Sequence, residues 1–211
     1  MASAVIHLCI AKQINEKLKL DEKLFFLGNI APDISKQIGT SREKSHFLSR
    51  PAQDIPNIDE FLDKYKQTMS NPFNLGYFVH LWADKLWFKE YVGKKRYNDS
   101  LKLLDGTIIS LPFEESIRLI YGDYTNMNIA LLDEYNLDLS LFYEELPLFE
   151  SDIDEIPIDK LQVLVDKMGL IIKNTQEKKS YVFDIHSVKH FIDDSVDKIL
   201  QKIDEYKLLD K

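Results

Sequence analysis

The sequence predicts an all-α fold, a multi-helix bundle, from three observations. Apolar residues recur every three to four positions through most of the 211 residues, which is the spacing of helices that bury one face. Strand signals are short and few, at residues 107–110 and 181–183. Gly and Pro number only seven each, and the chain contains neither an internal repeat nor a low-complexity tract. We therefore expect residues 1–211 to form a single helical domain.

Composition and charge exclude several classes of protein. Hydrophobic residues make up 45% and charged residues 29% of the chain, as in soluble globular proteins. The formal net charge of −8 argues against strong binding to nucleic acid or to an anionic membrane surface. Cys9 is the single cysteine, which excludes an intramolecular disulfide and a cysteine-based zinc cluster. With no leader peptide and no transmembrane segment in the sequence, we expect a cytoplasmic protein.

The first half of the chain contains clear signals for helix ends. Ser3 precedes the first helix as its expected N-cap, and Asn57 precedes the third. Gly28 is expected to end the second helix in a left-handed conformation. Pro72 opens the fourth helix and Gly93 closes it, which is the usual asymmetry between helix ends. We expect these four helices at residues 4–18, 21–27, 58–69 and 73–92.

The second half of the chain contains weaker signals. Helices are expected at residues 113–120, 124–135, 159–168 and 187–209. An acidic, proline-containing stretch at residues 150–159 is expected to join two helices of the same domain. In the last helix, Val188 and Ile192 belong to the core face, so His190 and Asp194 would face solvent.

His80 and Asp84 are the clearest pair of chemically active side chains. Positions i and i+4 of a helix share a face, so the imidazole and the carboxylate would point into the same volume. Gly76, one turn earlier, would leave room beside His80. Such a pair can bind one divalent metal ion through nitrogen and oxygen ligands. The alternative is a buried histidine that forms an ion pair with a carboxylate.

Three more residues could join this pair. His7 lies on the apolar face of the first helix, and a buried imidazole needs partners for its nitrogens. Asp33 follows an uncharged run at residues 28–32, where a proline-stiffened turn would hold it in place. His46 is a further imidazole in a polar region. Each has an ordinary alternative, namely a hydrogen-bonded core histidine, a turn-forming aspartate and a surface histidine.

The order of these motifs resembles the zinc-dependent phospholipase C family, which is related to the fungal zinc-dependent single-strand nucleases. The chain looks most like the short, leaderless bacterial members. The resemblance is dense over residues 1–92, and residues 93–211 would supply scaffold and part of the pocket. The motifs that carry it are His7, Gly28-Asn29-Ile30-Ala31-Pro32-Asp33, Ser45-His46 and Gly76-Tyr77-Phe78-Val79-His80-Leu81-Trp82-Ala83-Asp84.

This resemblance implies a helical bundle of the phospholipase C/zinc nuclease type that hydrolyses phosphoric esters at a zinc cluster. It implies that Asp33, His46, His80 and Asp84 hold one zinc ion. His7 would hold a second, with Asp84 as the bridging ligand. Asp33 would also position or deprotonate the attacking water, which makes it the expected catalytic residue. Clustered zinc ions lower the pKa of bound water and hold the attacking and leaving oxygens of a phosphoryl group.

Two departures from the family limit the number of zinc ions that we expect. Secreted members use a processed N-terminal amine as a ligand, whereas this chain begins at Met1 and His7 follows closely. The family's third zinc needs two histidines and a glutamate soon after the helix that carries His80. Glu90 is present there, but the next histidine is His186. We therefore expect one or two zinc ions and no third.

Other polar and aromatic residues are expected to be structural. His186 lies at or before the start of the last helix and His190 on its solvent side. Asp123 is a secondary candidate for the site that could equally be the N-cap of the helix at residues 124–135. Cys9 suits a small buried residue better than a nucleophile. Four aromatic residues are expected to form core and pocket wall: Trp82, Trp87, Phe88 and Tyr91.

Three functions remain open at this point. The first is a zinc-dependent phosphoric ester hydrolase, most simply a phosphodiesterase, acting on a small phosphoester or a phospholipid. The second is a non-catalytic helical protein with a structural metal site, whose coordination shell would be closed. The third is a metal-free interaction protein whose histidines are core residues. An HD-type phosphohydrolase is set aside, because the chain contains no His-Asp dipeptide. The sequence does not indicate an oligomeric state.

Overall fold

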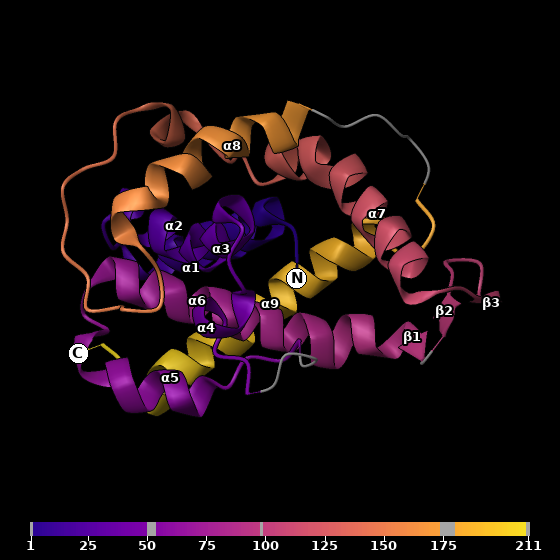
Figure 1. Ribbon diagram of the computed structural model, residues 1–211, viewed down its shortest axis with the longest axis horizontal. Helices are drawn as coiled ribbons and strands as arrows, with labels where there is room; N and C mark the ends of the chain where they lie inside the picture. The colour runs from indigo at the N-terminus through magenta and orange to yellow at the C-terminus, as the bar shows by residue number, and fades with distance from the viewer. Residues whose placement is uncertain (1, 50–53, 98, 174–179, 210–211) are drawn as a thin grey trace.

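The computed structural model describes residues 2–49, 54–97, 99–173 and 180–209, and most of them are helical, as predicted. The longer helices are α1 (Ala4–Leu18), α2 (Glu22–Ile30), α5 (Ile58–Tyr65), α6 (Pro72–Leu86), α7 (Phe113–Glu134), α8 (Leu161–Lys173) and α9 (Ile185–Tyr206). Figure 1 shows α7 and α8 along one long edge of the molecule and α5 near the opposite edge. Helices α1, α2 and α6 lie between them, and α9 runs diagonally from the α7 side toward α5.

The expected helix starts in the first half of the chain are confirmed. The Ser3 hydroxyl accepts a hydrogen bond from the Ile6 amide at 3.2 Å, which caps α1. The Asn57 side chain caps α5 in the same way, and Pro72 occupies the first turn of α6 after Asn71. These local signals therefore determine where the helices begin.

The expected end of α2 at Gly28 is wrong, because α2 continues to Ile30. A Cβ on Gly28 would lie 2.0 Å from the Phe73 carbonyl oxygen, and a Cβ on Gly76 would lie 2.1 Å from the Phe25 carbonyl oxygen. The two glycines therefore allow the backbones of α2 and α6 to approach each other closely. Gly76 leaves room for the neighbouring helix rather than for His80.

The expected single helix at residues 73–92 is also corrected. Regular α-helix ends at Leu86, a π-helical turn follows at Trp87–Tyr91, and a 3-10 turn follows at Val92–Lys94. The Trp87 ring is buried and lies 4.8 Å from the rings of both Tyr91 and Phe191. The widened turn thus belongs to an aromatic cluster that joins the end of α6 to α9.

The second half of the chain differs from prediction at residues 121–123. The two helices expected at 113–120 and 124–135 are one helix, α7, which passes through Gly122 and Asp123 without a break. The expected strand at residues 107–110 is present as β3 (Ile108–Ser110), which pairs antiparallel with β2 (Ser100–Lys102); β2 pairs in turn with β1 (Arg96–Tyr97). Residues 181–183 form no strand.

Residues 150–159 connect two helical segments, as expected, and they pack back onto the core. The buried Glu155 side chain accepts a hydrogen bond from the Tyr65 hydroxyl of α5 at 2.6 Å. At the last helix, Asp184 is the N-cap, and Val188 and Ile192 are buried, as their spacing predicts. Among the described residues, no helix combines the length and apolar character needed to cross a bilayer.

We predict that Gly76→Ala destabilises the protein strongly, whereas Gly122→Ala does not. The added methyl group at Gly76 meets the α2 backbone, and overpacking of this kind costs about 3 kcal/mol or more. A methyl group at Gly122 meets nothing within 4 Å, and alanine favours the helix there. Urea unfolding followed by circular dichroism measures both effects. Equal stability of Gly76→Ala and wild type would contradict the close helix contact.

Candidate metal centre

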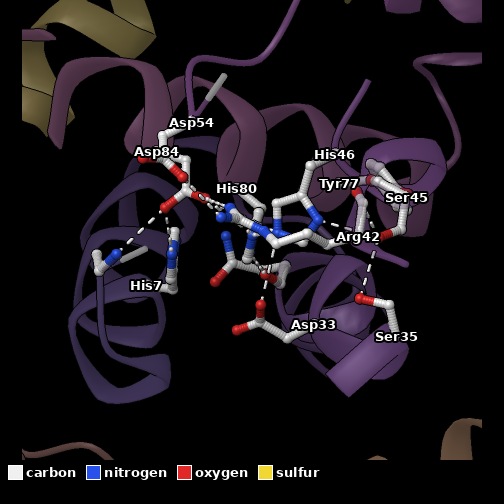
Figure 2. Close-up of polar contacts among 12 residues, drawn as sticks. His7, Asp33, Ser35, Arg42, Ser45, His46, Asp54, Tyr77, His80 and Asp84 are labelled. Atoms are coloured by element: carbon white, nitrogen blue, oxygen red, sulfur yellow. Dashed lines mark hydrogen bonds and ion pairs between the residues drawn. The ribbon is translucent and has the colours of Figure 1, made fainter. Parts of the chain in front are cut away.

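Four separate elements bring the five expected ligands together (Figure 2). His7 lies on α1, Asp33 ends a 3-10 turn at Ala31–Asp33, and His46 follows the short helix α4 (Arg42–Ser45). His80 and Asp84 lie on α6, one turn apart. The three histidines and Asp84 are fully buried, and Asp33 is 7% exposed. A buried cluster of this composition needs either hydrogen bonds or a cation to compensate its polar atoms.

The backbone of α2 orients His80. The Nδ1 atom of His80 lies 2.7 Å from the Asn29 carbonyl oxygen. A carbonyl oxygen can only accept, so Nδ1 is protonated and donates this hydrogen bond. The lone pair of the neutral ring is therefore on Nε2, which points into the cluster. Histidines that bind metal ions commonly donate their other ring N–H to a carbonyl oxygen in this way.

His46 is held in the matching orientation by Ser45. Its Nδ1 lies 2.9 Å from the Ser45 hydroxyl oxygen, and that hydroxyl can donate to the Arg42 carbonyl oxygen at 3.4 Å. The Tyr77 hydroxyl donates to the Ser45 carbonyl oxygen and fixes this segment on α6. The hydroxyl can accept the His46 Nδ1 proton, which would leave the Nε2 lone pair of His46 directed inward. It can also donate to Nδ1, which would place the proton of His46 on Nε2.

The two inward nitrogens face each other. His46 Nε2 lies 3.3 Å from His80 Nε2, and Asp33 Oδ1 lies 3.5 Å from His46 Nε2. Without a proton or cation between them, two lone pairs at this distance repel. Ligands at 2.0–2.1 Å from a tetrahedral metal are about 3.3–3.4 Å apart, which matches the separation of the two nitrogens. Asp33, His46 and His80 therefore form a group that could hold a metal ion.

Asp84 connects this group to His7. Its Oδ1 lies 3.3 Å from His7 Nε2, while its Oδ2 lies 3.8 Å from His46 Nε2 and 3.9 Å from His80 Nε2. The His7 ring stacks on the His80 ring with centroids 3.9 Å apart. Neither ring nitrogen of His7 makes a hydrogen bond, although the side chain is fully buried. With only the Asp84 carboxylate beside its Nε2, this imidazole is suited to a second cation.

The geometry can accommodate a bridged pair of ions. His7, His80 and Asp84 form a second group of possible ligands that shares His80 with the first group. Because Asn29 engages the Nδ1 atom of His80, this histidine has one free nitrogen and can serve only one ion. Asp84 has one oxygen toward each group, so it is the residue able to bridge them. With His80 assigned to the first group, His7 and Asp84 would remain for a second ion.

Burial and mutual contacts set the charge states of the cluster. Burial lowers the pKa of His80 well below its usual value, and the adjacent His7 acts in the same direction. Burial also lowers the pKa of His46, although Asp33 partly opposes this. Burial alone would raise the pKa of Asp33 and of Asp84, yet both are held below their usual range. The His46 side chain is the largest cause that lowers the pKa of Asp33, and for Asp84 it is the positive charge of the chain's amino group, followed by His7. At neutral pH, His46 and His80 are therefore neutral and both carboxylates ionised, as metal binding requires.

Sequence reasoning missed Arg42. Its Nη2 lies 3.5 Å from Asp84 Oδ2, and its Nη1 lies 3.1 Å from Asp54 Oδ1. Arg42 precedes His46 by four positions, so helical spacing could have indicated that the two residues share a face. From the second half of the chain, Tyr121 of α7 lies in the electrostatic field of Arg42, and burial raises its pKa.

The other sequence candidates lie outside the cluster. His186 and His190 are exposed on α9, as expected. Glu90 forms an ion pair with Lys198 of α9. Cys9 is fully buried, and burial raises the pKa of its thiol to about 12, so it behaves as a small core residue. The terminal amine of Met1 lies outside the described residues.

The expectation that Asp123 caps a helix is wrong. Asp123 lies inside α7 and is fully buried. Its Oδ2 atom accepts hydrogen bonds from the backbone amides of Val182 at 2.6 Å and Phe183 at 2.9 Å, and its Oδ1 accepts one from Tyr181 at 2.9 Å. The carboxylate thus anchors the segment before α9, which explains why residues 181–183 need no partner strand.

Comparisons with known proteins identify no relative. No family model matches the chain, and neither does any curated protein or solved structure. The resemblance to the zinc-dependent phospholipase C family therefore stays a prediction. The arguments for metal binding are the positions, burial and hydrogen bonds of the five side chains themselves.

We predict that Asp123→Ala lowers the free energy of unfolding by about 3 kcal/mol. The substitution leaves three backbone amides without their charged acceptor, and hydrogen bonds to charged groups are worth about 1.5–3 kcal/mol each before relaxation. Asp133→Ala removes an exposed carboxylate from the same helix and should change stability by less than about 0.5 kcal/mol. Urea unfolding compares the two; similar values would exclude an anchoring role.

We also predict that the metal-free protein loses stability as the pH falls below about 6.5. In the unfolded chain histidine titrates near pH 6.5, whereas the pKa values of His46 and His80 are lowered in the folded protein. Below that pH the unfolded state binds protons that the folded state does not. The free energy of unfolding therefore falls, by at most about 1.4 kcal/mol per pH unit for each histidine.

Urea unfolding between pH 7.5 and 5.5, in a buffer that contains a chelator, measures this dependence. His80→Gln should show a shallower pH slope than wild type because one buried imidazole is gone. His190→Gln removes an exposed histidine and should keep the wild-type slope. Identical slopes for wild type and His80→Gln would show that burial of this imidazole does not contribute to the pH dependence of the free energy of unfolding.

Proposed function

We propose that this protein is a zinc-dependent phosphoric ester hydrolase that acts on a phosphodiester, as the resemblance to the phospholipase C family implies. The observation that carries the proposal is the pair of facing Nε2 atoms of His46 and His80, 3.3 Å apart. The Ser45 hydroxyl holds the other nitrogen of His46, and the Asn29 carbonyl holds that of His80. The two nitrogens can share either a proton or a metal ion, and the carboxylates of Asp33 and Asp84 beside them favour a cation. Asp33, Asp84 and His7 complete a ligand set for one or two ions.

Zinc is the metal that the ligand chemistry favours. Imidazole nitrogen and carboxylate oxygen are both ordinary zinc ligands, and the separation of the two nitrogens suits a tetrahedral ion. Calcium and magnesium prefer ligand sets made of oxygen, which this cluster does not provide. When bound, zinc supplies Lewis acidity that lowers the pKa of water.

Asp33 is the residue that we propose to position or deprotonate the attacking water. Its side chain is 10% exposed, whereas those of His46 and Asp84 are fully buried, so Asp33 is the most exposed of these three residues. A carboxylate held ionised by its surroundings can orient the attacking water by accepting a hydrogen bond from it. The net charge of −8 favours a small phosphoester or a phospholipid over a polynucleotide as substrate.

A structural metal site is the second candidate, and the burial of the ligands favours it. Four of the five proposed ligands are fully enclosed, which is typical of closed sites that stabilise a fold. Such a site would join α1, α4 and α6 without catalysis. The two candidates share the metal and differ in whether a coordination position remains open to substrate.

We predict that the protein purifies with one or two zinc ions per chain, and that His80→Ala and Asp84→Ala each lose them. Elemental mass spectrometry measures metal content in protein prepared without chelator or nickel. His190→Ala and Asp63→Ala remove exposed side chains of the same types and should retain the metal. Wild type that holds no stoichiometric metal after zinc is offered would contradict the proposal.

Turnover of phosphoesters by the zinc-loaded protein separates the two candidates. A hydrolase should cleave at least one generic phosphodiester and lose this activity in Asp33→Asn. A structural site predicts zinc-loaded protein without activity, whose thermal unfolding temperature falls when zinc is removed. Chelation followed by zinc addition should restore whichever property is measured.

A further inference from the structure

Arg42 lies between the metal centre and solvent. Its guanidinium contacts Asp84 Oδ2, the same oxygen that faces His46 and His80. The Asp84 side chain is fully buried, whereas the Arg42 side chain is 26% exposed. The Phe88 ring supports the guanidinium, with 5.9 Å between Arg42 Cζ and the ring centroid. Arg42 thus presents a fixed positive charge at the outer edge of the cluster.

The hydrogen-bonding capacity of this guanidinium is only partly used. It has five N–H donors, and Nη1 and Nη2 engage Asp54 and Asp84. Its Nε is buried and has no hydrogen-bond partner. A buried donor without an acceptor is unfavourable, so the group can take a further anionic oxygen.

Asp54 shows where such an oxygen fits. Its carboxylate lies 3.1 Å from Arg42 Nη1, and its side chain is 42% exposed, outside the buried cluster. Carboxylate and phosphate oxygens offer similar geometry to a guanidinium, which binds both through its planar set of donors. The Asp54 carboxylate therefore occupies a position that an anionic ligand could take.

We propose that Arg42 recognises the phosphoryl group of the substrate, and that Asp54 competes with the substrate for the guanidinium. This inference rests on the proposed function, because it places the phosphoryl oxygens beside Asp84 and the two histidines. It makes opposite predictions for the two residues. Loss of Arg42 weakens anion binding, whereas loss of the Asp54 charge strengthens it.

Isothermal titration of zinc-loaded protein with inorganic phosphate tests the proposal, with metal content measured on every sample. Arg42→Gln should retain zinc and bind phosphate at least about tenfold more weakly than wild type. Arg42→Lys keeps the charge but not the planar set of donors. Its affinity for phosphate should therefore lie between those of wild type and Arg42→Gln. Asp54→Asn should bind phosphate more tightly than wild type. Lys44→Gln removes an exposed charge from the same short helix and should bind as wild type.

The outcomes separate this inference from the proposed function. Zinc-loaded Arg42→Gln that binds phosphate as tightly as wild type would overturn the role of Arg42 and leave the metal centre intact. Arg42→Gln that loses zinc while Arg42→Lys binds phosphate normally would also overturn it, because Arg42 would then only support Asp84. Phosphate binding that needs Arg42 but no metal would support the role of Arg42 and contradict the hydrolase. Wild type that binds neither zinc nor phosphate would overturn both.

Discussion

The close contact between α2 and α6 is the constraint on which the centre depends. Two glycines, one on each helix, bring the backbones together, and no side chain could replace either without displacing a carbonyl group. This contact places the Asn29 carbonyl oxygen against His80 and fixes which nitrogen of the ring carries the proton. The same helix leads into the turn that carries Asp33. One backbone approach therefore determines both the protonation and the position of ligands from two elements.

The charge states of the five side chains depend on their burial. Taken out of water, an imidazole favours its neutral form and a carboxylate favours its protonated form. Nearby positive charge and the contacts with the histidines keep the carboxylates ionised in spite of burial, which leaves negative charge in one small volume. Arg42 offsets part of that charge from outside. The centre is thus prepared electrostatically for a cation, and its solvent edge is prepared for an anion.

Short-range patterns predicted much of this structure. The phase of α6 was enough to place His80 and Asp84 on one face, and the caps at Ser3 and Asn57 were readable from single residues. Features that depend on a distant partner were not readable. Gly28 looks like a helix end in isolation because the chain gives no sign of the Phe73 carbonyl that will lie against it.

Asp123 illustrates the same limit. A Gly-Asp pair inside a polar stretch is a reasonable helix start by local rules, and only the arrival of residues 181–183 makes the aspartate a buried anchor. The role of Arg42 was partly predictable from the sequence. Its spacing from His46 was visible in the sequence, but its contact with Asp84 depends on how α4 packs against α6. Tertiary contacts therefore account for most of the differences between prediction and structure.

The burial of the ligands also has a kinetic consequence. Because His7, His46, His80 and Asp84 have no exposed surface, an ion held among them cannot be extracted by a chelator acting directly. Exchange has to wait for part of the wall to open, and α4, with four residues, is the shortest α-helix next to a ligand. The rate of exchange would then reach a limit set by the protein, independent of chelator concentration. Metal occupancy would reflect the conditions under which the chain folded more than the zinc level at any later moment.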